Sequence, residues 1–334
     1  MRFRAPPRES VDRAVFGHPV FAGVVTWRDW LSGKDWPDID VLNGALRAHM
    51  TGAGGLDSSP QGGALQFVPQ RAELLADGRH YEQRIAETGR IATREANWHD
   101  LLNALIWLRY PQIKRAMHGR QVADMARVGA KQRTRAQDAL TQFDEAGVIV
   151  SIDATADVEG LIQAWNRHAW GALFELMARS AWRIDVIGHA LLEHALEPER
   201  LLVGKAVVVV NDRLSRAESG LCSESGERVS RRAPTGHESD LKGEGCIGRG
   251  DSEAVAQVAQ DIDRGALLND PQELRPLPLM GLPGWHPRAG DPAFYADAEC
   301  FQPVRAGRRY PSPRFAASPG TAAARTREKG QHAR

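Results

Sequence analysis

Apolar residues recur at helical spacing most clearly between residues 98 and 108. The positions that share this face are Trp98, Leu101, Leu102, Leu105 and Leu108. Asn97 is a favourable N-cap residue, and Asp100 stands where a capping-box carboxylate would lie. Because Pro111 disfavours helical geometry at Tyr110, the helix should end or kink there. The pattern predicts a helix from about Asn97 to Tyr110, with its leucine face in the core.

Similar patterns predict other elements along the chain. Helices are expected at Pro37–Ala48, His80–Thr88, Asp157–Met177, Trp182–Leu196 and Ser252–Leu268. Strands are expected at Val148–Val150 and Leu201–Val210, with a turn at Asp144, Glu145 and Gly147 before the first of them. The sequence thus predicts an α+β fold, predominantly α-helical, as a single domain over residues 1–305 with a small β-sheet.

Three segments have a composition unlike the rest. Residues 211–250 are rich in Ser, Gly, Glu and Arg, and we expect a disordered insertion there. Residues 306–334 should form a disordered basic tail. Residues 109–135 contain eight Lys or Arg against one acid, and a solvated helix face explains them better than a nucleic-acid site, because no RNA-binding or helix-turn-helix pattern accompanies them.

Composition narrows the class of protein. The chain has 42% hydrophobic and 25% charged residues, and its 43 basic residues nearly balance 42 acidic ones. Three cysteines without CxxC spacing indicate neither a disulfide scaffold nor a zinc knuckle. No stretch approaches the roughly 20 apolar residues of a membrane span, and no apolar segment follows the basic start. We therefore expect a cytoplasmic protein without membrane association or bound cofactor; its partners are left open.

Several motifs, taken together in order, resemble a known family. The first is Asn97-Trp98-His99-Asp100-Leu101-Leu102-Asn103-Ala104-Leu105-Ile106-Trp107, preceded by Tyr81-Glu82 and Thr93-Arg94. Others are Asp138 with Thr141 to Gly147, Gly188-His189-Ala190-Leu191-Leu192-Glu193, Pro276-Leu277-Pro278 with Gly281 to Trp285, and Phe294-Tyr295. Over about residues 15 to 305 the chain resembles the bacterial family catalogued as domain of unknown function 3025, departing from it at 211–250. The resemblance supports the fold and implies no activity.

One candidate site lies on the helix that begins near Asn97. Around the helix, His99, Asp100 and Asn103 share an arc with Asn97, opposite the leucine face. A histidine beside an aspartate can act as a general base, because the carboxylate orients the ring and supports its charged form. Capping and helix packing explain the same residues, and this structural interpretation is the favoured one.

A second candidate site comprises Asp185, His189 and Glu193, which would lie at i, i+4 and i+8 on one helix. His189 and Glu193 could then bind the same metal ion, with a third ligand from His99, Asp144 or Glu145. Ordinary charged neighbours on a helix are the favoured alternative.

Two classes of function therefore stay open. The first is an enzyme, either a metal-assisted or a His/Asp acid–base hydrolase, whose pocket contains His99, Asp100 and His189. The second is a binding or scaffold protein in which these residues are structural. Whether the two histidines meet in space separates the two.

Overall fold

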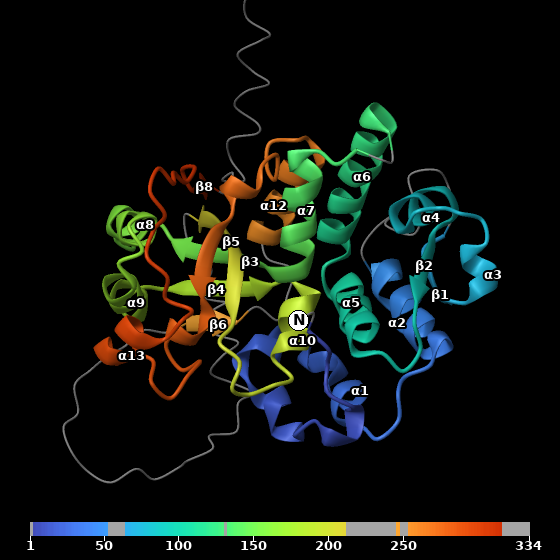
Figure 1. Ribbon diagram of the computed structural model, residues 1–334, viewed down its shortest axis with the longest axis horizontal. Coiled ribbons are helices and arrows are strands. Elements are labelled where there is room, and N and C mark those ends of the chain that lie inside the picture. Colours follow the sequence, from blue (N-terminus) through green and yellow to red (C-terminus); the bar gives the residue numbers. More distant parts are fainter. Residues whose placement is uncertain (1–2, 53–63, 130–131, 212–244, 248–252, 316–334) are drawn as a thin grey trace, which may run out of the picture.

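The computed structural model describes residues 3–52, 64–129, 132–211, 245–247 and 253–315 (Figure 1). Within these residues helices predominate. The α-helices are α1 (Arg28–Ser32), α2 (Ile39–Gly52), α3 (Ala72–Leu75), α4 (Tyr81–Thr88), α5 (Trp98–Arg109), α6 (Pro111–Val128), α7 (Arg135–Ala146), α8 (Val158–Asn166), α9 (Trp170–Ala178), α10 (His189–His194), α12 (Glu253–Asp263) and α13 (Pro292–Asp297). The 3-10 helices are η1 (Arg8–Ser10), η2 (Arg13–Gly17), η3 (Pro19–Trp27), η4 (Pro271–Glu273) and η5 (Leu279–Gly281).

The described strands form two sheets. They are β1 (Gln66–Pro69), β2 (Arg90–Thr93), β3 (Gly147–Asp153), β4 (Trp182–Val186), β5 (Val203–Asn211), β6 (Gly245–Ile247), β7 (Arg275–Pro278) and β8 (Arg314–Phe315). The larger sheet has the order β6-β4-β3-β5-β7, with β8 also paired to β5. β3 is parallel to β5 and antiparallel to β4, whereas β1 and β2 form a separate parallel pair. The predicted α+β class is therefore confirmed.

The central strands are buried on both faces. All seven residues of β3 are buried, as are the last six of β5, and Ile149 is in register with Val207. Continuous runs of Val and Ile are typical of strands that helices cover on both sides. In Figure 1 the sheet lies between α8, α9 and α13 on one side and α5, α6 and α7 on the other. Both predicted strands are present: β3 is longer than expected, and β5 begins two residues later and ends one residue later than expected.

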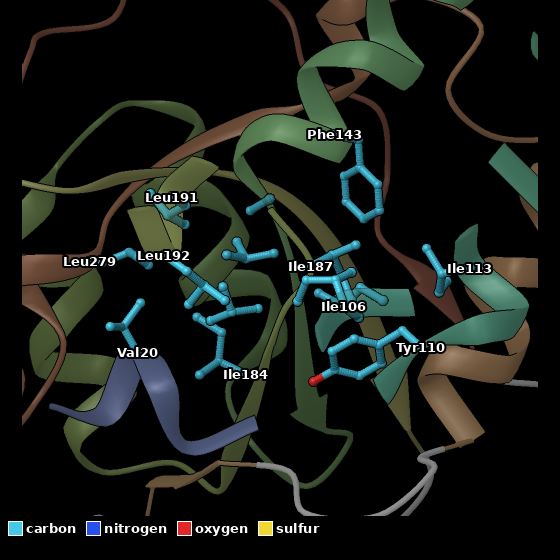
Figure 2. Packing of buried hydrophobic residues seen from close by; sticks show 14 of the residues in the cluster. Val20, Ile106, Tyr110, Ile113, Phe143, Ile184, Ile187, Leu191, Leu192 and Leu279 are labelled. Carbon is cyan, nitrogen blue, oxygen red and sulfur yellow. The ribbon is translucent and has the colours of Figure 1, made fainter. Parts of the chain in front are cut away.

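A continuous apolar core joins the sheet to the helices around it. Figure 2 shows Val20 of η3, Ile106 of α5 and Ile184 of β4 close to Leu191 and Leu192 of α10. Each of these side chains is at most 3% exposed. The packing fixes α5 and α10, the two helices that carry the candidate histidines.

The predicted α5 follows its sequence signals closely. Its N-cap Asn97 accepts a hydrogen bond from the amide of Asp100 at 3.1 Å, and Tyr110 terminates it. Pro111 then begins α6 directly, as expected of proline in the first turn of a helix. α4 likewise ends at Gly89, whose left-handed backbone (φ 69°) suits glycine.

Three expectations about local structure are wrong. Trp182–Leu196 is not one helix: its first part is β4, where Ile184 and Val186 suit a buried strand, and its last part is the short α10. Asp144 and Glu145 lie in the last turn of α7 rather than in a turn. The helix expected at Asp157–Met177 is two helices, α8 and α9, separated at His168, whose φ of 54° is not helical.

Two short strands differ from the expected disorder. β6 falls within residues 211–250 and pairs with β4, and β8 falls within 306–334 and pairs with β5. Each adds to the edge of an existing strand, which supplies main-chain partners that composition does not reveal. Most of these two segments lies outside the described residues. Of the helices that are described, none has the length and apolar character needed to cross a bilayer.

The core position of Leu105 gives the first prediction. Its side chain is fully buried on α5. Leu105→Ala should lower the free energy of unfolding by about 2–5 kcal/mol, because it removes buried methyl groups and leaves a cavity. Urea denaturation followed by circular dichroism measures the change. The exposed Leu75→Ala is the control, and a loss at Leu105 no larger than the control's would contradict the assigned packing.

A second prediction concerns His118 of α6, which is buried. Burial, with a smaller contribution from the charge of Lys114, lowers its pKa to about 4. Because the unfolded chain has an ordinary histidine pKa near 6.5, it binds the proton more readily than the folded state. Stability contributed by neutral His118 is therefore present above about pH 6.5 and is lost as the pH falls toward 4, by about 3 kcal/mol.

Denaturant titrations between pH 7 and pH 4.5 test this. His118→Phe should make the loss of stability on acidification smaller than in the wild type. His49→Gln, at an exposed position of α2, is the matched control for replacing a histidine. Parallel stability curves for the wild type and His118→Phe would contradict the prediction.

Candidate functional site

The two candidate histidines lie against each other, one on α5 and one on α10. Nε2 of His99 is 3.0 Å from Nε2 of His189, and the ring centroids are 4.4 Å apart. His189 is buried, whereas 31% of the His99 side chain is exposed. The two histidines that the sequence singled out are therefore in contact, although the structural interpretation had been favoured for each.

Glu193 orients His99. Its Oε2 lies 2.8 Å from Nδ1 of His99, across the contact between α10 and α5. Glu193 stands four residues after His189 on α10, as expected from the helical spacing of this pair. The carboxylate thus fixes Nδ1, while Nε2 of the same ring faces His189. Glu193 was named as a metal ligand, but here it contacts the ring nitrogen that points away from His189.

The last turn of α7 supplies two more carboxylates. Oδ2 of Asp144 lies 3.9 Å from Nδ1 of His189, and Oε2 of Glu145 lies 3.9 Å from Nε2 of His189. Both residues had been considered as a third ligand. In Figure 1, α10 lies between α5 and the end of α7, so the three helices converge at the histidine pair.

One subset of this cluster has the geometry of a metal site. Ligand atoms of His99, Glu145 and His189 all lie within 4.8 Å of one another. Two imidazoles and a carboxylate are the protein ligands of many catalytic zinc sites. Zinc bond lengths of 2.0–2.2 Å place neighbouring tetrahedral ligand atoms about 3.3 Å apart. The observed 3.0 and 3.9 Å are close to this value, and the third pair, His99 and Glu145, lies within 4.8 Å, so the main adjustment falls on the half-exposed glutamate.

Within the described part of the chain, Asp100 forms no hydrogen bond with either imidazole. Its carboxylate accepts one hydrogen bond from the main-chain amide of Arg94 at 2.5 Å and another from the Arg94 guanidinium at 2.7 Å. Its carboxylate therefore ties the N-terminus of α5 to the segment after β2. Asp100 acts on His99 only as a more distant negative charge.

Asn103 belongs to a polar chain behind the histidines. Its side-chain amide donates to the Tyr81 hydroxyl at 3.2 Å, and its carbonyl oxygen accepts from Lys114 Nζ at 2.9 Å. Lys114 also donates to Oδ1 of Asp144 at 2.5 Å. The chain of contacts thus runs from Tyr81 through Asn103 and Lys114 to Asp144, which faces His189.

Sequence reasoning missed Lys114 by assigning it to a solvated basic face. Its side chain is only 5% exposed. The available signal was its spacing: Lys114 precedes the buried Met117 and His118 by three and four residues, and therefore shares their face of α6. An ammonium group on such a face needs a carboxylate partner, which Asp144 provides.

The pKa values of the cluster diverge. The hydrogen bond that His99 donates to the Glu193 carboxylate raises the pKa of His99, whereas burial lowers the pKa of His189 to about 4. Burial alone would raise the pKa of Asp144, but the charges of Lys114 and His189 hold it below its ordinary value. Burial raises the pKa of Glu145. Groups with such separated pKa values are characteristic of functional sites.

Asp185 does not join this cluster, contrary to the expected i, i+4, i+8 arrangement. It lies on β4, where its carboxylate forms a buried ion pair with Arg183 at 3.1 Å and accepts from the Tyr110 hydroxyl at 3.2 Å. The error follows from the wrong helix assignment, because a strand residue cannot share a helical face with His189. The role of Asp185 in these contacts is structural.

Comparisons with known proteins bear on the family alone. No curated protein and no solved structure matches this chain. A family model described as "Protein of unknown function (DUF3025)" matches residues 65–305, a range that includes all the cluster residues and starts later than the motifs suggested. Since this match spans well over half of the sequence, the chain belongs to the DUF3025 family of proteins of unknown function.

Proposed function

We propose that this protein is a metal-assisted hydrolase in which His99, His189 and Glu145 bind one divalent transition-metal ion of the zinc type. The observation that carries the proposal is the convergence of three ligand atoms within 4.8 Å of one another. In this arrangement both imidazoles use Nε2, and each Nδ1 faces a carboxylate, Glu193 for His99 and Asp144 for His189. Carboxylates behind histidine ligands are typical of zinc sites.

Charge supports the same assignment. Among the carboxylates near the cluster, Asp100 is paired with Arg94, and Asp144 is paired with Lys114. Glu145 and Glu193 instead lie against imidazoles, Glu145 3.9 Å from His189 and Glu193 2.8 Å from His99. A divalent cation between the imidazoles would balance these two carboxylates without requiring a protonated histidine.

Three protein ligands leave a coordination position for water. The exposed sides of His99 and Glu145, 31% and 46% of their side chains, give solvent and a small substrate access to that position. A zinc-bound water has a pKa near 7 and supplies a hydroxide nucleophile at neutral pH. Hydroxide attack on an ester or amide carbonyl is the reaction this arrangement supports best.

The metal-free acid–base alternative has less support. It placed Asp100 beside His99, but the Asp100 carboxylate is held by the main chain and side chain of Arg94, and Glu193 contacts the ring instead. The scaffold alternative makes a different prediction, since the histidines would then contribute only to stability. Metal uptake separates these two classes of function.

The third prediction is zinc uptake. The full-length chain, dialysed against zinc and then against buffer, should retain about one zinc per molecule by elemental analysis. Zinc at about 100 times its Kd should stabilise the protein by about 2.7 kcal/mol in a thermal or urea melt. His99→Ala and His189→Ala should abolish retention, whereas His49→Ala, outside the cluster, should keep it.

A graded variant tests the role of Glu193 in the same assay. Glu193→Gln should retain zinc with about 10–100-fold weaker affinity, because the amide cannot support the charge on His99. Glu197→Gln, which lies outside the cluster and pairs with Arg200, is its control. Zinc-free protein, with alanine variants that lose only stability, would support the scaffold function instead.

The fourth prediction is hydrolysis of an activated ester. Zinc-loaded protein should cleave p-nitrophenyl acetate faster than the metal-free protein does. Glu145→Gln should reduce kcat/KM by tenfold or more, about 1.4 kcal/mol of transition-state stabilisation, because a neutral amide is a poor zinc ligand. The control is Glu159→Gln, at an exposed position of α8. Equal rates for the wild type, the metal-free protein and Glu145→Gln would contradict a hydrolytic metal site.

A further inference from the structure

A pocket of about 300 Å³ adjoins the cluster at Glu145. Its walls come from the end of α7, from α10 and from residues 200–203 before and in β5. Six of its nine lining residues are Ala, Leu or Val, among them Ala190 and Leu201. The polar lining is confined to Glu145, His194 and Arg200. Such a volume is within the range of small-molecule sites, which are mostly apolar with a few polar groups.

The charges at the pocket do not favour an anionic ligand. Arg200 is the one cationic lysine or arginine of the lining, and its guanidinium Nε is held by Glu197 Oε2 at 2.8 Å. Glu145 adds a carboxylate at the end nearest the histidines. A carboxylate or phosphate in the pocket would therefore meet an arginine that is already paired with Glu197 and, near the histidines, a second carboxylate, whereas an apolar group meets mostly carbon.

An aromatic ring of this chain already lies against two residues of the lining. The Phe3 ring stands edge-on to His194, with centroids 4.4 Å apart and an interplanar angle of 74°. The Arg200 guanidinium carbon is 4.4 Å from the centre of the same ring. His194 and Arg200 are thus already engaged with a ring of the chain itself, and the lining left for a ligand is mostly apolar.

We propose that this pocket is the subsite for the apolar side group of the substrate, which is an ester or amide with an aromatic or medium-length aliphatic acyl chain. The inference rests on the proposed hydrolytic function, since it places the scissile carbonyl at the cluster. Glu145 belongs to both the cluster and the pocket. A carbonyl held at the cluster can therefore extend its acyl chain directly into the pocket. Water adds across the acyl bond, giving a hydrophobic carboxylic acid and an alcohol or amine.

The specificity follows from the shape of the pocket. An acetyl group leaves it unfilled, whereas a phenylpropionyl group places its ring among Ala190, Leu201 and the other apolar walls. A second cavity of about 630 Å³ shares Arg200 and Leu202 with the pocket but contains none of His99, Glu145 and His189. Of these two cavities, the pocket of about 300 Å³ is therefore the one that adjoins the proposed metal site.

Hydroxamates test the inference, because the hydroxamate binds zinc and its tail reports on the pocket. The full-length protein is titrated by calorimetry with acetohydroxamate and with 3-phenylpropionohydroxamate, in zinc-loaded and in metal-free form. We expect zinc to be required for tight binding of both compounds. The phenylpropionyl tail should add about 10–100-fold in affinity over acetyl, as expected for burial of a phenyl group.

Variants localise the effect of the tail. Ala190→Phe fills the pocket and should remove the preference for the phenylpropionyl compound over acetohydroxamate. Leu201→Asn keeps a similar size but makes the wall polar, and should reduce the preference if Ala190→Phe does not fold. Ala296→Phe, at an exposed position of α13, is the control for adding a ring.

The outcomes distinguish the two proposals. If zinc does not increase the affinity for acetohydroxamate, the proposed metal centre is wrong. The pocket is then tested alone: the metal-free protein should still prefer the phenylpropionyl compound, and Ala190→Phe should abolish that preference. If acetohydroxamate binds through zinc but the tail adds nothing, the metal centre stands and the pocket assignment is overturned. A preference that survives both pocket variants also overturns it.

Discussion

The arrangement of the cluster depends on the close contact between the end of α7 and the beginning of α10. The amides of Ile187 and Gly188 both donate to the carbonyl oxygen of Gly147 at 2.9 Å. A Cβ atom on Gly188 would lie 2.5 Å from Cα of Ala146, a distance that side chains do not tolerate. Glycine at 188 therefore allows two backbones to touch, and this contact brings Glu145 next to His189.

This contact alone does not hold the charged groups in place, because buried charges need partners of their own. Lys114, with 5% of its side chain exposed, is bonded to Asp144 and Asn103. The pair is costly to assemble, since both groups lose water, and it is not needed for a well-packed core. Its position behind His189 is better explained as support for that ring than as a source of stability.

The elements that depend on short-range signals could be predicted from the sequence. Capping by Asn97 and the leucine periodicity defined α5, and valine-rich runs defined β3 and β5, because these signals act within a few residues. Sequence reasoning misassigned β4, since Asp185 happens to stand one helical turn before His189, although it is a strand residue paired with Arg183. Long-range pairing with β3 decides that segment, although the β-branched Ile184 and Val186 already suit a strand.

The third ligand could not be chosen from sequence for a similar reason. With a turn at 144–145, Asp144 and Glu145 had no defined directions, whereas their place in α7 makes them successive residues about 100° apart around a helix. They therefore reach opposite nitrogens of one imidazole, Asp144 at Nδ1 and Glu145 at Nε2 of His189. Only Nε2 also faces His99, so helical geometry places one carboxylate, Asp144, on the far side of the ring and the other, Glu145, on the side that His99 shares.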